Sequence, residues 1–384
     1  MFTLIENGEV YTPEPIVKTS LLIGGGKVLR VGEVERRQLD QLGIPIDVID
    51  ATGCYVVPGF IDPHLHLIGG SGERGWSSQT PEISLAELAL GGITTVVGTL
   101  GVDTATRTMA ALVGKVKGLR EEGISAYCWT GGYAVPPATL TGSARDDVLF
   151  VEEVIGAGEI AISDRRASEP TTGELARLVS EVHNGGMLAG KAGVTHFHVG
   201  DAMRRLAPLR ELLDEFDVEP AWIYPTHVER NEALIAEAVE LTRRGCWIDV
   251  DVVGKDLAKW LRFYGEKEGD PSKLTVSSDA AITSPRNLHG QLRECVLEHG
   301  YSLEEVLRLV TTNTASVLKL KKGRIEVGAD ADVVVLTRRD LEVRDVVSGG
   351  RRLVKEGAMA FTPRFLEESD RKVELVGRKV EGKG

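Results

Sequence analysis

The sequence predicts an α/β protein: a (β/α)8 TIM barrel with a small β-sandwich module formed by the N- and C-terminal segments. Apolar segments and helix-like segments alternate through the middle of the chain, which is the pattern of a parallel barrel. Both ends instead show short apolar runs separated by glycine-rich turns. The expected divisions are residues 1–56 and 323–384 for the β module and 57–322 for the barrel.

Eight apolar segments are the candidate barrel strands, and helix-like segments lie between them. Helix-like residues 104–123 and 171–186 both begin with threonine and end with glycine, which are helix start and stop signals. Residues 229–245 are a further candidate helix. The candidate strands are residues 56–61, 93–99, 125–130, 159–163, 195–199, 221–226, 246–252 and 273–278.

Length and composition bound the class of protein. The chain has 384 residues, of which 42% are hydrophobic and 27% are charged, as in soluble globular proteins. A barrel alone takes about 250 residues, so a second module fits. The net charge of −12 leaves no basic surplus for binding a nucleic-acid backbone.

Cysteine usage and the apolar runs bear on location. The four cysteines are widely spaced without a C-x-x-C pair, so buried free thiols in a reducing compartment are expected. The opening residues lack the basic and apolar regions of a signal peptide, and no apolar run approaches about 18 residues. A cytoplasmic protein without a membrane partner is expected.

The segment Asp62-Pro63-His64-Leu65-His66 ends the first candidate strand. Side chains two residues apart on a strand point to the same side, so His64 and His66 project together. Active sites of barrels lie at this end of the strands, and paired imidazoles are good zinc ligands. An ordinary polar pair at a strand end is the alternative for this motif taken alone.

Three further metal-ligand candidates end other strands: His198 the fifth, His227 the sixth and Asp279 the eighth. Only eight histidines occur in the chain, and four fall at strand ends. The coincidence of five such residues at one barrel mouth predicts a metal site. His196 lies deeper in its strand and is expected to support the ligands or to pack. The remaining histidines, His183, His289 and His299, are expected on helices or on the surface.

As a set, these motifs resemble the amidohydrolase superfamily. The segment VVPGFIDPHLHL resembles its entry into the barrel, and GRIEVGADADVVVL resembles its return to the β module. Closer matches to isoaspartyl (β-aspartyl) dipeptidases are HLIGGSGERG, WTGGYAVPPATLTGS, AISDRRAS, GKAGVTHFHVGD and PTHVERN. The resemblance implies a zinc-dependent hydrolase that cleaves β-aspartyl dipeptides, and it implies a homo-oligomer.

The resemblance also implies substrate-binding residues. Glu73 would hold the substrate's α-ammonium, and Tyr133 would hydrogen-bond the scissile carbonyl oxygen. Arg166 and Arg230 would bind substrate carboxylates, for which a guanidinium fork is suited. Arg165 is the neighbouring alternative to Arg166.

Four positions depart from the family pattern. Glu159 stands where many members carry a lysine whose carbamate bridges two metals. Strand alternation turns Glu159 toward the barrel interior, so we expect its carboxylate to bridge two ions; a single-metal site is the alternative. Ser71 replaces a glycine, Val102 replaces a threonine that contacts substrate, and Thr283 replaces a serine.

The implied chemistry is hydrolysis by a water that bridges two divalent ions, expected to be zinc, and that the bridge makes available as hydroxide. His64, His66, Glu159 and Asp279 would hold one ion, and His198, His227 and Glu159 the other. Asp279 would take the proton of the attacking water and pass it to the leaving amine. Tyr133 would help to stabilise the oxyanion.

Two other functions remain open on the sequence. One is a hydrolase of N-acyl amino acids or cyclic amides from the same superfamily, which would have less need of Glu73. The other is a non-catalytic scaffold on this barrel, for which the change at Glu159 is the only supporting feature, since the four histidines and the aspartate are all present.

Overall fold

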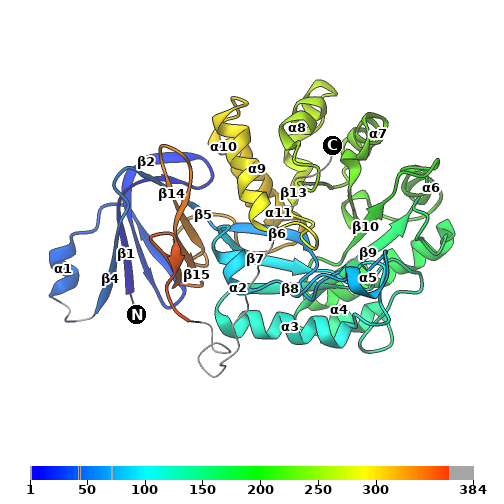
Figure 1. Cartoon of the computed structure of the whole chain (residues 1–384), viewed down its shortest axis with the longest axis horizontal. Coiled ribbons are helices and arrows are strands. Elements are labelled where there is room, and N and C mark those ends of the chain that lie inside the picture. The colour runs from blue at the N-terminus through cyan, green and yellow to red at the C-terminus, as the bar shows by residue number, and fades with distance from the viewer. Residues whose placement is uncertain (1, 42, 44, 71, 363–384) are drawn as a thin grey trace.

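The computed structural model describes residues 2–41, 43, 45–70 and 72–362. Ser71, one of the substrate-pocket candidates, therefore lies outside the described residues, as do residues 363–384 of the expected C-terminal segment. A β module and a larger α/β module lie side by side along the long axis of the molecule (Figure 1).

The β module is one sheet to which both ends of the chain contribute. Within the described residues it has nine strands in the order β17-β16-β15-β14-β5-β1-β2-β3, with β4 paired to β1. β14 pairs antiparallel with β5 and so joins the C-terminal strands to the N-terminal ones. The two-sheet sandwich stays a prediction. The strands are β1 (Phe2–Tyr11), β2 (Pro15–Gly24), β3 (Lys27–Val31), β4 (Ile46–Asp50), β5 (Cys54–Pro58), β14 (Val333–Thr337), β15 (Val343–Ser348), β16 (Arg351–Lys355) and β17 (Ala358–Met359).

Eight parallel strands form the second module. Six make one sheet in the order β11-β10-β9-β8-β7-β6, and the other two, β12 and β13, pair with each other. Hydrogen bonds join the two sheets at both of their junctions. Between β11 and β12, Trp247 N donates to Ile223 O over 3.2 Å; between β6 and β13, His66 N donates to Ala280 O over 2.9 Å. The strands are β6 (Phe60–Leu65), β7 (Ile93–Gly98), β8 (Ser125–Thr130), β9 (Val154–Ile162), β10 (Val194–Val199), β11 (Ile223–Thr226), β12 (Ile248–Asp251) and β13 (Leu274–Ser277).

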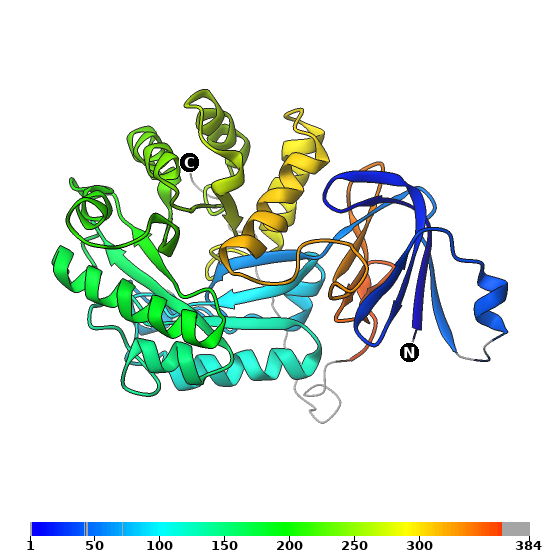
Figure 2. The same ribbon diagram turned by 180° about the vertical axis from the view of Figure 1, so that it is seen from behind.

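Helices follow the strands and cover the outside of the ring, as the two opposite views show (Figures 1 and 2). Among the described residues, no helix is both long and apolar enough to cross a bilayer. The helices are α1 (Arg36–Asp40), which belongs to the β module, α2 (Leu85–Ala89), α3 (Met109–Glu122), α4 (Ala144–Phe150), α5 (Thr172–Ala189), α6 (Ala207–Glu215), α7 (Glu232–Arg244), α8 (Leu257–Glu266), α9 (Arg286–Leu297), α10 (Leu303–Val310) and α11 (Thr312–Val317). Short 3₁₀ turns are η1 (Trp76–Ser78), η2 (Pro220–Trp222), η3 (Val228–Arg230) and η4 (Pro271–Lys273).

The predicted helix ends agree with the structure in part. Gly123 ends α3 with φ of 108°, as expected, but the expected start at Thr104 is wrong: the helix begins at Met109, and Thr108 caps it by accepting from Ala111 N. The expected end of α5 at Gly185 and Gly186 is wrong, because the helix continues to Gly190. A Cβ on Gly186 would lie 2.3 Å from Gly193 Cα, so this glycine serves close packing rather than termination.

Two strand predictions need correction. Residues 56–61 are not one strand: β5 ends at Pro58 in the module sheet, and β6 begins at Phe60 in the barrel. The fourth barrel strand starts at Val154, five residues before the expected start at Glu159. A Cβ on Gly156 would lie 2.3 Å from Val194 O, so glycine at this position allows β9 and β10 to approach closely. The other six strand predictions agree to within about three residues.

The carboxyl ends of the parallel strands meet at one face of the ring. The six candidate ligands lie near these strand ends: two at the end of β6, one each on β9 and β10, and one each just after β11 and β13. These ligands are His64, His66, Glu159, His198, His227 and Asp279. The fold therefore brings strand-end side chains from across the sequence to one place.

Candidate active site

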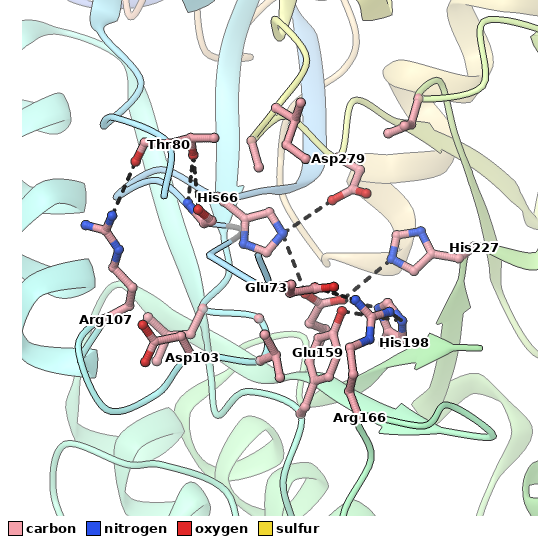
Figure 3. Close-up of a pocket in the computed structure, with 18 of the residues that line it drawn as sticks. His66, Glu73, Thr80, Asp103, Arg107, Glu159, Arg166, His198, His227 and Asp279 are labelled. Atoms are coloured by element: carbon pink, nitrogen blue, oxygen red, sulfur yellow. Dashed lines mark hydrogen bonds and ion pairs between the residues drawn. The ribbon is translucent and has the colours of Figure 1, made fainter. Parts of the chain in front are cut away.

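A cavity of about 660 Å³ opens at the carboxyl ends of the barrel strands (Figure 3). Of the predicted site residues that the structure describes, all but His64 line it. His64 is fully buried beneath it. The predicted residues along the cavity wall are His66, Glu73, Val102, Tyr133, Glu159, Arg166, His198, His227, Arg230, Asp279 and Thr283.

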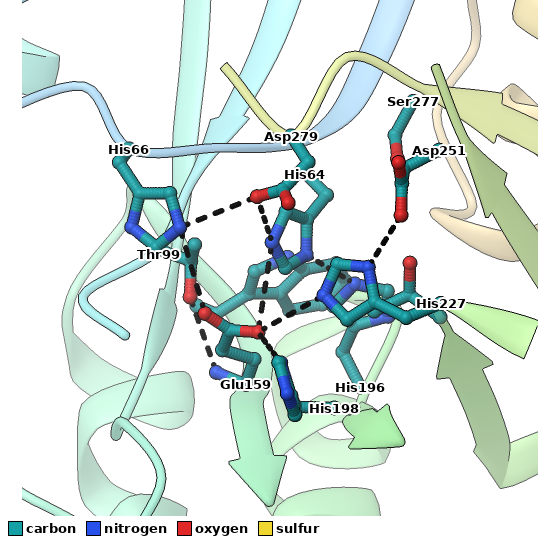
Figure 4. A network of polar contacts seen from close by, with 12 residues as sticks. His64, His66, Thr99, Glu159, His196, His198, His227, Asp251, Ser277 and Asp279 are labelled. Atoms are coloured by element: carbon teal, nitrogen blue, oxygen red, sulfur yellow. Dashed lines mark hydrogen bonds and ion pairs between the residues drawn. The ribbon is translucent and has the colours of Figure 1, made fainter. Parts of the chain in front are cut away.

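The carboxylate of Glu159 lies among four imidazoles (Figure 4). Its Oε2 is 2.7 Å from His198 Nδ1, 3.5 Å from His227 Nε2 and 3.6 Å from His64 Nε2. Its Oε1 is 3.6 Å from His66 Nε2. The side chain is 1% exposed. Burial raises the pKa of Glu159, but the neighbouring imidazoles outweigh burial and hold it well below 4.5.

Asp279 faces the same histidines from the other side. Its Oδ1 lies 3.3 Å from His64 Nε2 and 3.4 Å from His66 Nε2. Burial raises the pKa of Asp279, but the close imidazoles of His64 and His66 outweigh burial and hold it well below 3.8. Both His227, with φ of 63°, and Asp279, with φ of 43°, adopt the left-handed backbone region, which side chains other than glycine enter rarely.

These residues have the chemistry of a metal site. Three sets have ligand atoms within 4.8 Å of one another: His64, His66 and Asp279; His64, Glu159 and His227; and His227, Asp251 and Asp279. His64 Nε2 and Glu159 Oε1 are buried without a hydrogen-bond partner, although both face the cluster. A buried polar atom is costly unless it is paired, and a divalent cation at this point would pair both. The residues present therefore fit a divalent metal ion.

Carboxylates support two of the histidines from behind. Asp251 Oδ2 lies 2.7 Å from His227 Nδ1, and Asp164 Oδ2 lies 3.1 Å from His198 Nε2. Each contact leaves the other ring nitrogen directed at Glu159, which is how carboxylates orient metal-binding imidazoles. Sequence reasoning missed Asp164 and Asp251. Their positions are a signal, because Asp251 ends β12 and Asp164 follows β9, but a strand-end carboxylate does not by itself show which imidazole it pairs with.

Glu73 and the two arginines meet on one wall of the cavity. Arg166 NH1 is 2.6 Å from Glu73 Oε1, while Arg166 Nε and NH2 each lie 2.8 Å from Asp164. Arg230 donates from Nε to Val199 O over 2.8 Å, and its NH2 lies 3.3 Å from His198 Nε2. Both guanidinium groups thus lie beside the cluster of candidate metal ligands.

The Tyr133 hydroxyl faces the same cluster. It lies 3.4 Å from His198 Nε2, and the side chain is buried. Burial, with the negative charge of Glu159, raises the pKa of Tyr133 well above 10. The phenol therefore keeps its proton near neutral pH and remains a hydrogen-bond donor.

The remaining predicted residues fall as follows. Val102 is 38% exposed at the cavity edge, and Thr283 lines the cavity with a buried hydroxyl that has no protein partner. Arg165 is exposed and is absent from the cavity lining, so Arg166 is the arginine that enters the site.

The other histidines lie away from the cavity or below it. His183 stacks on Trp222 with ring centroids 3.7 Å apart. His289 Nε2 is 2.8 Å from Leu341 O, and His299 lies near Glu294. His196 is fully buried beneath His64. None of the four lines the cavity among the described residues.

Comparison with known proteins agrees with this geometry. A family model described as the amidohydrolase family matches residues 161–353, and a second model of the same description matches residues 47–98. A β-aspartyl dipeptidase from the thermophilic, keratin-degrading Fervidobacterium islandicum AW-1 is 38% identical, with a TM-score of 0.90 over 94% of this chain and 99% of that one. A structure of the dipeptidase from that organism in complex with β-Asp-Leu dipeptide gives 36% identity and a TM-score of 0.87, over 94% of this chain and 98% of that one.

A further relative is a D-hydantoinase from Geobacillus stearothermophilus, 42% identical over 100 residues. That match spans 25% of this chain and 19% of the hydantoinase. The family models together reach both the first barrel strand and the later strands that bear the histidines and Asp279. The chain belongs to the amidohydrolase family.

Proposed function

We propose that this chain is a metal-dependent β-aspartyl dipeptidase. The observation that carries the proposal is one cavity that joins a metal-ligand cluster to a glutamate and two arginines. A β-aspartyl dipeptide has an ammonium group and two carboxylates around its scissile amide, so this set of charges matches it. The similarity to a dipeptidase solved with β-Asp-Leu supports the same substrate class.

We assign two divalent ions, zinc by preference, to the cluster. His64, His66 and Asp279 would hold one ion, His198 and His227 the other, and Glu159 would bridge the two. When bound, the ions would supply a water of lowered pKa and polarise the scissile carbonyl. The position of the Glu159 carboxylate, within 3.6 Å of one nitrogen of each of four imidazoles, supports the bridging role.

Asp279 is the proposed general base. Its carboxylate lies at the cavity wall beside His64 and His66, on the side open to the substrate. It would accept the proton of the attacking water and donate it to the leaving amine. Tyr133 would donate a hydrogen bond to the carbonyl oxygen as negative charge develops there, since its phenol stays protonated.

Glu73, Arg166 and Arg230 would bind and orient the substrate. Asp164 bonds to both Nε and NH2 of Arg166, which fixes the plane of that guanidinium and directs NH1 toward Glu73 in the cavity wall. Arg230 is held by one hydrogen bond from its Nε to Val199 O. Side chains held this rigidly convert binding energy into orientation of the scissile bond.

A cyclic-amide hydrolase is the second candidate. The 42% identity to a D-hydantoinase over 100 residues favours it. Such a substrate has no free ammonium group and would leave Glu73 without a ligand partner. The cavity charges therefore favour the dipeptide.

A substrate panel tests the proposal. The zinc-loaded protein would be assayed with β-Asp-Leu, α-Asp-Leu, N-acetyl amino acids and dihydroorotate. Cleavage of β-Asp-Leu with little or no cleavage of the others supports the dipeptidase function. Cleavage of the acylated or cyclic substrates without β-Asp-Leu would replace it with the second candidate.

A further inference from the structure

A contact between two histidine rings lies beneath the cluster of candidate metal ligands. His196 of β10 is fully buried, and its Nε2 is 2.8 Å from Nδ1 of His64 (Figure 4). On its other side, His196 Nδ1 is 2.8 Å from the carbonyl oxygen of Tyr224. His64, His196 and the Tyr224 carbonyl thus form a continuous chain of contacts that ends at the metal-ligand cluster.

The Tyr224 carbonyl, at one end of this series of contacts, determines the direction of each hydrogen bond in it. A carbonyl oxygen only accepts, so His196 Nδ1 must carry the hydrogen. In a neutral imidazole the other nitrogen is then an acceptor, so His196 Nε2 accepts from His64 Nδ1–H. With its hydrogen on Nδ1, His64 keeps a free lone pair on Nε2, the atom that is buried without a partner and faces Glu159 and Asp279.

We propose that His196 is a positioning residue that fixes the tautomer of His64, so that Nε2 is available as a metal ligand. His196 supplies the acceptor, and the Tyr224 carbonyl determines which nitrogen of His196 accepts. His227 and His198 are oriented by carboxylates instead. Of His64, His198 and His227, only His64 is oriented, within the described residues, by a neutral imidazole and not by a carboxylate.

The packing around His196 holds it in this orientation. Trp129 stacks on the ring at 5.2 Å with an interplanar angle of 23°, and Tyr224 covers it at 4.5 Å. Trp129 is itself held, because its indole N–H donates to Pro63 O over 3.0 Å. A Cβ on Gly158 would lie 2.8 Å from His196 Cβ, so glycine is needed directly before Glu159 for this close approach.

The inference rests on the proposed metal-ligand role of His64 but not on the identity of the substrate. Its test is therefore zinc binding rather than activity. The full-length protein would be stripped of metal and titrated with zinc against a chromophoric chelator, as wild type, His196→Phe and His196→Gln. Phenylalanine keeps the aromatic ring but offers no acceptor, whereas a glutamine amide can accept from His64 and donate to Tyr224 O.

We expect His196→Phe to weaken zinc binding by roughly 10- to 100-fold, the usual effect of removing the partner of a ligating histidine. We expect His196→Gln to bind zinc as the wild type does. His183→Phe is the matched control, because that histidine also stacks on an aromatic ring, Trp222, far from the cluster. Thermal unfolding of the metal-free proteins would show whether each variant is folded.

Two results would overturn the inference: zinc binding that is unchanged in both variants, or binding that is weakened equally in both. The second would mean that the ring's shape matters and its hydrogen bonds do not. A wild type that binds no zinc would remove the metal site and this inference together. A wild type that binds zinc but cleaves no β-aspartyl peptide would refute only the proposed substrate.

A measurement on the wild type needs no substitution of His196. In zinc-loaded protein with ¹⁵N-labelled histidine, nitrogen chemical shifts report which ring nitrogen carries a hydrogen. Both His64 and His196 should carry the hydrogen on Nδ1. A hydrogen on Nε2 of His64 would contradict the proposal even if the phenylalanine variant did not fold.

Discussion

Glu73 and Arg166 form an ion pair of 2.6 Å on one wall of the cavity, although 93 residues separate them in the sequence. The two side chains are 47% and 32% exposed, so water and ligands reach both. A zwitterionic substrate that enters between them would replace one ion pair with two, its ammonium at Glu73 and its carboxylate at Arg166. A ligand with only one of these charges would leave either Glu73 or NH1 of Arg166 without its present partner, while Asp164 would still hold Nε and NH2 of Arg166.

Glu73→Gln should therefore lower kcat/KM for β-Asp-Leu by roughly ten- to a hundredfold, because a hydrogen bond to a charged group contributes about 1.5–3 kcal/mol. Steady-state kinetics with the zinc-loaded protein measures this. Glu82→Gln is the control, since Glu82 is exposed and pairs with Lys115. Equal kcat/KM in Glu73→Gln and wild type would refute the ammonium role.

Tyr133→Phe should lower kcat by about 10²- to 10³-fold and leave zinc content unchanged, since it removes a donor aimed at the developing oxyanion. KM should change little, because the bond strengthens only in the transition state. Tyr127→Phe on β8 is the control, as its ring packs outside the cavity. A fall in zinc content, or an increase confined to KM, would assign Tyr133 a different role.

Glu159→Gln should weaken zinc binding by more than about 100-fold, because a lost ligand outweighs a lost supporting contact, which costs 10- to 100-fold. Neutral glutamine cannot balance the charge of two divalent ions. Chelator competition and metal analysis by mass spectrometry measure affinity and stoichiometry. A variant that still binds two zinc ions at wild-type affinity would show that Glu159 is not the bridge.

Asp251→Asn should weaken zinc binding by roughly 10- to 100-fold through His227, whose Nδ1 lies 2.7 Å from the Asp251 carboxylate. Activity should return when excess zinc is added, because Asp251 acts through the ligand and not on the substrate. Asp256→Asn, in the loop before α8, is the control. Failure of added zinc to restore activity would point to a direct role in the reaction.

A pH-dependent prediction concerns Glu237 on α7, outside the cavity. Burial raises the pKa of Glu237, but hydrogen bonds to Arg210 and Arg205 outweigh it and hold the pKa below 4.5. A carboxylate with a depressed folded-state pKa stabilises the fold above its unfolded pKa and loses that effect as pH falls through the folded value. The stabilisation is therefore complete at pH 7 and is lost below about pH 4.5.

Glu237→Gln should lower the free energy of unfolding at pH 7 by about 1 kcal/mol, since the two arginines are 42% and 38% exposed and solvent weakens the pairs. The difference from wild type should shrink toward zero in acid. Urea unfolding at pH 7 and at pH 3.5 measures it. Glu240→Gln, whose side chain is 63% exposed, should stay within about 0.5 kcal/mol at both pH values. A difference for Glu237→Gln that is independent of pH would exclude the ion pairs as its cause.

The ligand motif could be predicted from the sequence because its signals are local. His64 and His66 are two residues apart on a strand, and the strand-end positions of His198, His227 and Asp279 follow from the alternation of strands and helices. Parallel strands of a barrel end at one face, so the pattern alone predicts that these side chains meet. The inward orientation of Glu159 also follows from strand alternation.

Strand and helix ends were less well predicted, because glycine has two opposite uses. Gly123 and Gly245 end helices with positive φ, as expected. Gly156 and Gly186 lie inside regular elements, where they allow another part of the chain to approach closely. Sequence does not distinguish these uses, since the approaching backbone comes from a distant segment.

Only the tertiary structure decided which side chains support the ligands. The contact of His64 with His196 spans 132 residues, and those of Glu73 with Arg166 and His227 with Asp251 span 93 and 24. Each depends on the register of neighbouring strands and on side-chain rotamers that packing selects. The sequence by itself determined the residue types and the face of the barrel on which they meet, because strand periodicity is local. The partners of each imidazole were decided by contacts between distant strands. These contacts exist only once the eight strands have closed into a barrel.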